Sequence, residues 1–163
     1  MLKPNSLRQH LCSAVPALKR DPDKLAVFIR DGKLVSAGGE SLSFEYRYTL
    51  NLVLLDYADH ADAIMVPLLA WLQLNQPEIA ENPDLREKAL RFEVEFLNAA
   101  TVDLSIEVDL TERVLVRPRD GGIGLDVKHL GEPAHAGATP SGETWEVFFQ
   151  GERLAAWAFP VKT

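Results

Sequence analysis

The sequence predicts an α+β fold: a mostly antiparallel sheet with one helix packed across it, an N-terminal helix and a C-terminal β-hairpin. Apolar and polar residues alternate over residues 43–56 and again over 90–110, which is typical of strands with one buried face. Apolar residues recur at helical spacing in residues 7–18 and 64–75, which predicts two helices. The 163 residues match the usual size of one domain, so we expect a single core.

The N-terminal helix is predicted from an apolar stripe that runs from Leu7 to Leu18. Ser6 followed by Gln9 has the spacing of a capping box, in which each side chain satisfies a free backbone donor, so we expect the helix to begin there. The turn-rich segment KRDPDK at 19–24 ends it. We interpret Cys12, beside the stripe, as a small buried side chain.

A hairpin is predicted next. The segments LAVFIR (25–30) and KLVSA (33–37) flank Asp31-Gly32, a dipeptide that suits the positive backbone angles of a two-residue turn. Gly38-Gly39 then interrupts the chain.

The most regular alternation follows, over residues 43–56. Aromatic and leucine side chains share one face, and polar side chains, among them Glu45 and Arg47, share the other. At about 3.3 Å per residue, this strand would extend beyond the body of a small domain. We expect it to cross the middle of the sheet or to project toward another subunit.

The second helix is predicted from the apolar period over residues 64–75 and should pack across the sheet. Asp59 or Asp62 is the expected N-terminal cap, since carboxylates favour the positive end of the helix dipole. Pro67 should bend the helix, and Pro77 marks its end.

Two further strands, residues 90–96 and 102–110, are joined by a connection short enough for a hairpin. The second continues to Val116 with a bend expected at Thr111-Glu112. Each has one apolar face and one acidic face, as expected of an antiparallel sheet half exposed to water. The acidic side chains are Glu93, Glu95, Asp103, Glu107 and Asp109.

The C-terminal part begins with a turn at 120–122 and a short strand in 123–130. Residues 131–142 are linker-like, with small residues, Gly and Pro and no periodicity. Residues 143–163 contain a hairpin that carries Trp145, Phe149 and Trp157. These aromatic side chains need a surface to pack on, either their own domain or a partner subunit.

Composition excludes several classes of protein. The net charge is −7, without a dense cluster of Lys and Arg, so sequence-specific nucleic-acid binding is not expected. No apolar run reaches transmembrane length, and no signal-peptide core is seen, so no membrane partner is expected. A single cysteine can form neither an intrachain disulfide nor a four-cysteine zinc site. We therefore expect a soluble protein of a reducing cytoplasm.

No motif for catalysis, metal binding or cofactor binding is recognised, so we expect no enzyme, metal or cofactor. The cluster from Asp56 to Asp62 is interpreted as solvated carboxylates at a strand-to-helix turn. Arg113, Arg117 and Arg119 form the one concentrated basic stretch, which either balances the acidic strands or contacts an acidic partner. These features favour a protein that acts through its surfaces.

Three long segments resemble the phage tail completion protein R (GpR) family of contractile-tailed phages and related tail-like bacteriocins. They are LKRDPDKLAVFI (18–29), SLSFEYRYTLNLVLLDYADHADAIMVPLLAWL (41–72), with NQPE (75–78), and TVDLSIEVDLTERVLV (101–116). The likeness covers roughly residues 1–130, a tail completion domain, while residues 131–163 depart from the shorter members of the family.

The resemblance implies a structural virion protein with a tail-terminator-like fold. Such a protein is made in the bacterial host cytoplasm and acts at the head-proximal end of the tail. There it stops polymerisation of the tube and allows head–tail joining. The implied partners are further copies of the chain in a hexameric ring, the tail tube protein, and sheath or head–neck connector proteins.

The candidate interface combines the charged strand faces with the C-terminal aromatic residues. It comprises Glu45, Arg47, Glu93, Glu95, Asp103, Glu107, Asp109, Arg113, Arg117, Arg119, Trp145, Phe149 and Trp157. Two other functions remain open. One is a tail-assembly chaperone or other assembly factor that is absent from the mature particle. The other is a small-ligand-binding α+β domain, which would need an enclosed pocket with convergent polar groups.

Overall fold

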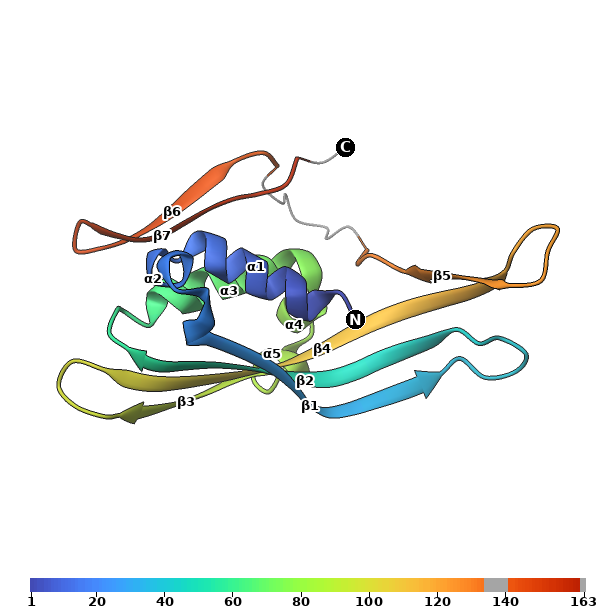
Figure 1. The fold of residues 1–163 in the computed structure, drawn as a ribbon, viewed down its shortest axis with the longest axis horizontal. Coiled ribbons are helices and arrows are strands. Elements are labelled where there is room, and N and C mark those ends of the chain that lie inside the picture. The colour runs from blue at the N-terminus through green and yellow to red at the C-terminus, as the bar shows by residue number, and fades with distance from the viewer. Residues whose placement is uncertain (134–140, 162–163) are drawn as a thin grey trace.

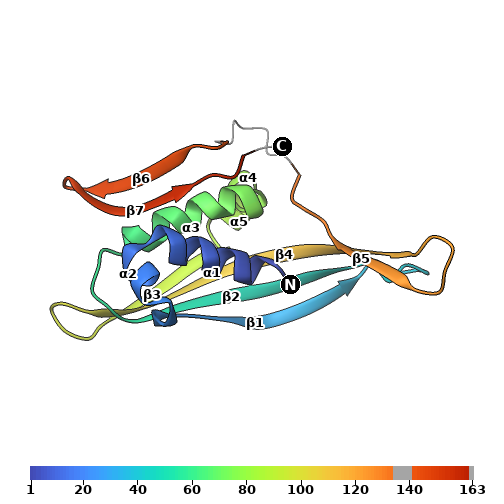
Figure 2. The same ribbon diagram turned by 45° about the horizontal axis from the view of Figure 1, so that its top comes forward.

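A long, curled antiparallel sheet forms one layer, and helices and a separate hairpin lie on one side of it (Figure 1; Figure 2). The structure is a computed structural model that describes residues 1–133 and 141–161. Four strands follow the order β1-β2-β4-β3, and β5 also pairs with β4. The strands are β1 (Leu25–Ser36), β2 (Phe44–Tyr57), β3 (Leu90–Phe96), β4 (Val102–Pro118), β5 (Leu125–His129), β6 (Thr144–Phe149) and β7 (Glu152–Ala158).

Two long helices cover the sheet, and short helical turns connect them to the strands. The helical elements are α1 (Lys3–Ala14), α2 (Pro16–Arg20), the 3-10 helix η1 (Pro22–Lys24), α3 (Asp62–Asn75), α4 (Glu78–Glu81) and α5 (Pro83–Arg86). The sequence prediction of an α+β fold with a mostly antiparallel sheet is confirmed.

The core lies between the sheet and the two long helices. Leu50 and Leu52 of β2 and Ile106 of β4 are completely buried, and they pack in one cluster with Leu11 of α1 and Leu68 of α3. Burial of each such side chain stabilises the fold by roughly 1.5–3 kcal/mol. The period-two pattern of the sequence therefore identifies the face of the sheet that the helices cover.

Helix α1 begins earlier than the predicted capping box. It starts at Lys3, its N-cap residue is Leu2, and no side chain caps it. Ser6 is inside the helix, where its hydroxyl accepts a hydrogen bond of 3.1 Å from the indole N–H of Trp71. The prediction was wrong because a tertiary contact with α3 uses the hydroxyl that the sequence pattern assigned to the helix start.

The hairpin predicted at Asp31-Gly32 is also wrong. Residues 25–36 form one strand, β1, which pairs with β2 along its whole length. Asp31 and Gly32 lie where the register shifts between Arg30 and Lys33, and Asp31 has a φ of 51°. The positive backbone angle read from the dipeptide is present, but it produces a bulge rather than a reversal of the chain. The reversal follows at Gly38 and Gly39, both with positive φ.

Helix α3 has the predicted place and length but not the predicted cap. Its N-cap residue is Ala61, without a side-chain cap, so neither Asp59 nor Asp62 fills that role. Asp62 lies in the first turn, where its charge favours the helix dipole. The helix continues through Pro67 to Asn75.

Strand β4 is continuous from Val102 to Pro118, and its pairing with β2 keeps one register from Leu104 to Val114, so the bend expected at Thr111-Glu112 is not a break in the strand. The register with β2 shifts only at the other end, between Leu54 and Tyr57. The alternation also keeps its phase: Leu110, Glu112 and Val114 are all buried. An acidic residue therefore occupies a position on the helix-facing side of the sheet.

The C-terminal hairpin is confirmed. β6 and β7 pair around Gln150 and Gly151, both with positive φ, as a two-residue turn requires. The hairpin lies on the side of the helices away from the sheet, which gives three layers (Figure 2). Trp157 and Phe159 join the same buried cluster as the helices. Part of the linker-like segment, residues 134–140, lies outside the described residues.

At one end the sheet projects past the helices. Here the end of β1 and the start of β2 run beside the end of β4 and β5, and their two connecting loops form the tip (Figure 1). We call residues 33–47 and 113–129 the arm. The strand over 44–57 thus extends beyond the body, as its length predicted.

Candidate assembly surfaces

Most of the predicted interface residues share the face of the sheet that points away from the long helices α1 and α3, here called the outer face. The register aligns Glu45 with Arg113 and Thr49 with Asp109, which puts the odd-numbered residues of β4 on that face. The outer face carries Glu45, Arg47, Glu93, Glu95, Asp103, Glu107, Asp109, Arg113 and Arg117. Arg119 follows the end of β4 in the tip of the arm.

In the middle of the outer face, the charges neutralise one another. Arg91 of β3 makes two hydrogen bonds to Asp109, of 3.0 and 3.1 Å, and lies 3.5 Å from Glu107. Thr49 donates to Asp109 at 2.7 Å. Burial raises the pKa of Asp109, but the bonds from Arg91 and Thr49 outweigh it and hold that pKa below its usual value. Glu107 and Asp109 are thus engaged within the chain.

The two ends of the outer face differ in charge. Glu93 and Glu95 are exposed on β3, at the end away from the arm. Arg113 and Arg117 are exposed on the arm itself. The structure therefore places the exposed pairs Glu93 and Glu95, and Arg113 and Arg117, at opposite ends of the outer face, and Glu45 lies at the arm end, opposite Arg113.

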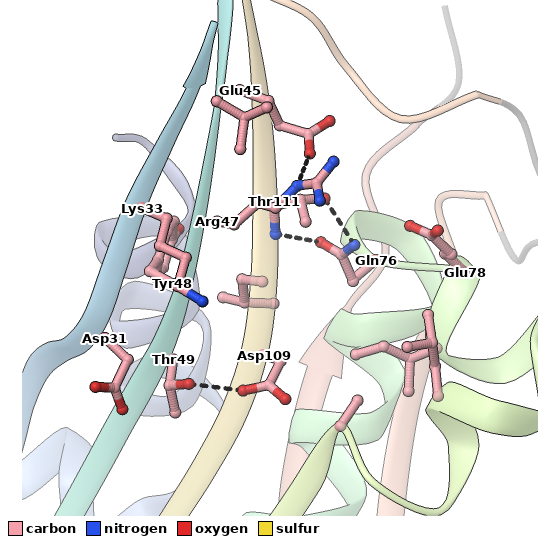
Figure 3. Close-up of a pocket in the computed structure, with 15 residues that line it drawn as sticks. Asp31, Lys33, Glu45, Arg47, Tyr48, Thr49, Gln76, Glu78, Asp109 and Thr111 are labelled. Carbon is pink, nitrogen blue, oxygen red and sulfur yellow. Dashed lines mark hydrogen bonds and ion pairs between the residues drawn. The ribbon is translucent and has the colours of Figure 1, made fainter.

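An open concavity of about 600 Å³ lies on the outer face beside α4 and α5 (Figure 3). Its polar groups contact one another: Arg47 pairs with Glu45, and Thr49 donates to Asp109. A small-ligand site would need an enclosed pocket with convergent, unpaired polar groups. This open concavity does not provide one.

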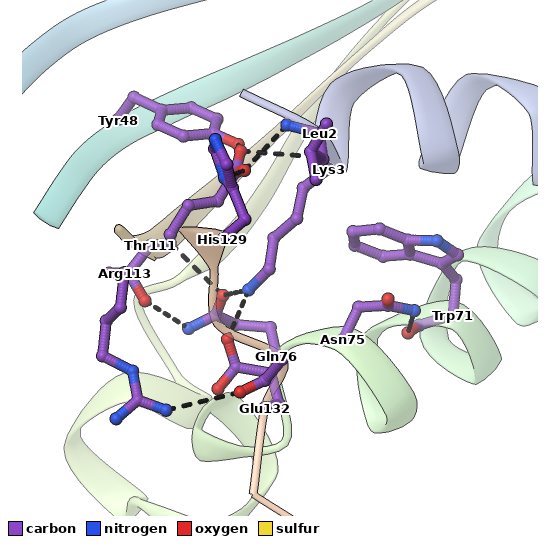
Figure 4. A network of polar contacts seen from close by, with 12 residues as sticks. Leu2, Lys3, Tyr48, Trp71, Asn75, Gln76, Thr111, Arg113, His129 and Glu132 are labelled. Carbon is purple, nitrogen blue, oxygen red and sulfur yellow. Dashed lines mark hydrogen bonds and ion pairs between the residues drawn. The ribbon is translucent and has the colours of Figure 1, made fainter. Parts of the chain in front are cut away.

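On the opposite face of the sheet, the carboxylate of Glu112 is a buried junction. It accepts a hydrogen bond of 2.6 Å from the hydroxyl of Tyr48 and bonds of 2.7 and 3.3 Å from the backbone N–H groups of Leu2 and Lys3. His129 of β5 lies 3.2 Å from it, and only 5% of Glu112 is exposed. Four of the neighbours of this carboxylate are labelled in Figure 4. The junction joins α1, β2, β4 and β5.

Opposing influences act on the pKa of Glu112. Burial is the largest single influence and raises this pKa. The hydrogen bonds from Tyr48, Leu2 and Lys3 lower it, and together they outweigh burial. The net pKa is below the usual value, so the group is charged near neutral pH. Burial beside this anion, in turn, raises the pKa of Tyr48 far above its usual value.

The side chain of Gln76 fills a gap in the sheet. β3 and β5 pair with the same edge of β4, and Gln76 lies between them, at Thr111 (Figure 4). Its carbonyl accepts from the Thr111 N–H at 3.2 Å and from Lys3 Nζ at 2.7 Å. Its amide donates to the Thr111 hydroxyl at 3.0 Å. The amide thus replaces a missing strand residue.

Sequence reasoning missed both Glu112 and Gln76. For Glu112 a signal existed, since the alternation places it in phase with Leu110 and Val114 on the apolar face. For Gln76 none existed, because its partner Thr111 lies 35 positions away in the sequence.

The aromatic candidates of the hairpin have different environments. Trp157 is buried, with ring centroids 6.1 Å from His10 and 6.1 Å from Phe159. Trp145 is 44% exposed, and its indole N–H donates to Glu143. Phe149 is 43% exposed and its ring lies 4.4 Å from that of His60. Trp145 and Phe149 are thus accessible to a partner, whereas Trp157 belongs to the core.

Within residues 1–133 and 141–161, no group of three His, Cys, Asp or Glu side chains is arranged to hold a metal ion. Among the helices of this part of the chain, none is long and apolar enough to cross a membrane.

Comparison with known proteins gives the family. Residues 1–133 match the family model of the P2 phage tail completion protein R (GpR). The chain is also 41% identical, over 157 residues, to "Tail completion protein R" of Escherichia phage P2, with 96% of this chain and 99% of that protein covered. No solved structure matches the chain.

The second match extends further than the family model. Because 157 residues are aligned, the likeness to the P2 protein extends past residue 133 into the segment that forms the C-terminal hairpin. The family match over most of the chain and the high identity to a full-length relative agree with the resemblance of the three sequence segments. The chain belongs to the P2 phage tail completion protein R (GpR) family.

Proposed function

We propose that this protein is a structural tail protein that completes the tail tube at its head-proximal end, stops polymerisation and allows the head to join. The observation that carries the proposal is the alignment, over 96% of this chain and 99% of the relative, with a tail completion protein of phage P2. A protein of this role must match the end of the tube on one side and present a different surface on the other.

The distribution of chemistry over the fold supports this role. The outer face of the sheet is polar and charged, whereas the opposite side of the molecule is the hairpin layer with Trp145 and Phe149 exposed. Two chemically different sides suit a protein placed between unlike neighbours. The proposed partners are the tail tube protein, sheath or head–neck connector proteins, and further copies of the chain in a hexameric ring.

A ring makes weak contacts sufficient. Each subunit would add the same modest set of contacts to the tube, so avidity replaces a strong single site. Ring formation requires head-to-tail contacts between copies, since a two-fold contact closes at the dimer.

The decisive experiment is electron microscopy of tails assembled without this protein. We expect overlong tubes that fail to join heads, and normal tails when the protein is supplied again. Tails of normal length that join heads would contradict the proposal.

Mass spectrometry of purified tails separates a tail component from an assembly factor. We expect this chain to be present in finished tails in a fixed ratio to the tube protein. Its absence from finished particles that depend on it would favour the assembly-factor function.

A further inference from the structure

Among the described residues, no helix covers the helix-facing side of the arm (Figure 1), and this side is apolar. Leu34, Leu125 and Val127 lie on this side and expose 61%, 51% and 63% of their surface. The tip adds Leu42 and Ile123, exposed by 64% and 108%. Scattered exposed apolar side chains are ordinary, but several of them together on a projecting element are typical of a contact surface.

A second apolar surface lies at the other end of the same sheet. A groove of about 350 Å³ runs between α3 and β3, and its lining includes Met65 and Leu69 of α3 and Phe92 and Val94 of β3. Phe92 is 64% exposed and Leu69 is 48% exposed. We call this the α3–β3 groove.

The two ends of the sheet carry opposite net charge. The arm has six basic and four acidic side chains. Next to the groove, segments 56–62 and 93–103 have six acidic side chains and no Lys or Arg. Apolar contact supplies affinity, and opposite net charge at the two ends favours the approach of unlike ends.

One chain cannot bring its own arm to its own groove. β4 lines the groove with Leu104 and Ile106 and forms part of the arm from residue 113 onward. From Leu104 to Val116 a strand spans about 40 Å, at about 3.3 Å per residue. The occupant of the groove is therefore another molecule, and a second copy of this chain carries an arm of the required chemistry. Contacts of this kind repeat head to tail and close into a ring when the rotation between neighbours allows it.

We infer that the arm of one copy docks in the α3–β3 groove of the next copy, which identifies the subunit contact of the proposed ring and rests on that proposed function. The tip, with Ile123, enters the groove. Arg119, in the tip loop, approaches the acidic segments beside it.

Photo-crosslinking in assembled tails tests the contact. A photoreactive amino acid replaces Ile123, which makes no buried contact, in a mixture of isotopically heavy and light chains. We expect crosslinked peptides that pair heavy with light chains and join residue 123 to residues 61–69 or 90–106. Crosslinks only to other segments or other tail proteins, or none between copies, would overturn the inference.

Two matched variants sharpen the result. A label at Trp145, on the exposed hairpin, should give no crosslink to the groove peptides. A label at Leu42, in the other tip loop, should give the same crosslinks as the label at Ile123. The Leu42 label is used instead if the Ile123 label prevents incorporation into tails. Failure at both tip positions counts against the contact.

Charge reversal gives an independent measurement. Arg117→Glu with Arg119→Glu should abolish the crosslink from Leu42 to the groove. The control, Lys19→Glu with Arg20→Glu on the exposed surface of α2, makes the same change in charge and should leave it intact. The two proposals can fail separately. If tails made without the protein are overlong but no arm–groove crosslink forms, only the contact is contradicted. If tails made without the protein are normal, the terminator function is contradicted.

Discussion

At the scale of single residues, the carboxylate of Glu112 connects parts of the chain that are far apart in the sequence. The N–H groups it binds at Leu2 and Lys3 are 110 and 109 positions away, and the Tyr48 hydroxyl is 64 positions away. A buried charge is tolerated only when hydrogen bonds replace the lost water, and here three do so.

Glu112 should make the free energy of unfolding depend on pH in the acid range. Its pKa in the folded protein lies below the ordinary value of 4.5, so its contribution is complete above about that pH and is lost as the pH falls through the lower, folded-state pKa. We expect Glu112→Gln to lower the free energy of unfolding at neutral pH by about 1–3 kcal/mol and to flatten its acid dependence. Urea unfolding over a pH series measures both. Glu95→Gln on exposed β3 is the control, and parallel pH curves for wild type and Glu112→Gln would contradict the prediction.

Gln76 should be as important to the sheet as a strand residue. Leu has a similar volume, but Gln76→Leu removes the acceptor of the part-buried N–H of Thr111 and the buried amide that closes the sheet edge, so we expect a loss of about 1–3 kcal/mol in the free energy of unfolding. Gln73→Leu, on the exposed side of α3, should change it by less than about 0.5 kcal/mol. Thermal or urea unfolding compares the two, and equal effects would show that Gln76 does not close the sheet edge.

At the scale of elements, the hairpin β6–β7 packs on the helices beneath it mainly through Trp157, which belongs to the same buried cluster as α1 and α3. Trp157 is 6% exposed and meets His10 of α1, whereas Trp145 on the paired strand is 44% exposed. The two tryptophans are register partners in the hairpin, yet only Trp157 is buried.

The two tryptophans therefore predict different outcomes. Trp157→Ala should cost about 3–5 kcal/mol of unfolding free energy, since it empties a filled part of the core. Trp145→Ala should cost about 1 kcal/mol and leave the fold unchanged, because its ring is partly solvated. Tryptophan fluorescence during urea unfolding reports both, and the prediction fails if the costs are reversed or equal.

The sequence predicted elements best where one face of an element is buried throughout. The alternation over residues 43–56 identified the central strand and its covered face, because period two leaves little ambiguity of side. It failed where a local motif had two structural uses. Asp31-Gly32 supports a turn or a bulge, and pairing with a long β2 selects the bulge. Ser6 supports a cap or a tertiary hydrogen bond, and Trp71 selects the second.

For the surfaces, charge could be read from the sequence but its placement could not. The sequence analysis found the acidic and basic residues, yet only the register shows that Arg91 neutralises Asp109 while Glu93 and Glu95 remain exposed. The groove under α3 combines residues from two separate segments, 61–69 and 90–106, so no local pattern announces it.

At the scale of the whole molecule, charge is divided along the long axis of the sheet. The arm is basic, and the segments beside the α3–β3 groove are acidic. Such a division repels identical ends and favours association of unlike ends, which orients one copy relative to the next.

Incorporation into tails should therefore be sensitive to salt. The screening length shortens from about 8 Å at physiological ionic strength to about 3 Å at 1 M salt. The contribution of charge at the exposed rim of the contact therefore falls. At 1 M salt we expect the protein to associate about tenfold more weakly with tails assembled without it than at physiological ionic strength. This difference equals about 1.4 kcal/mol of contact energy. Co-sedimentation across a salt series measures it. The variant Arg117→Glu with Arg119→Glu should already associate weakly at low salt, and association of the wild type that is indifferent to salt would contradict the prediction.

One feature of the sheet determines where the chain can change length. β2, β3 and β5 all pair with β4, so an insertion or deletion within β4 would turn the side chains beyond it to the wrong face along several pairings at once. The loops at the tip of the arm, residues 37–42 and 119–124, are exposed on an overhang and impose no such penalty. Over evolutionary time, insertions and deletions should therefore accumulate at the tip and be absent from β4, so that related proteins adapt to different neighbours while the fold stays the same.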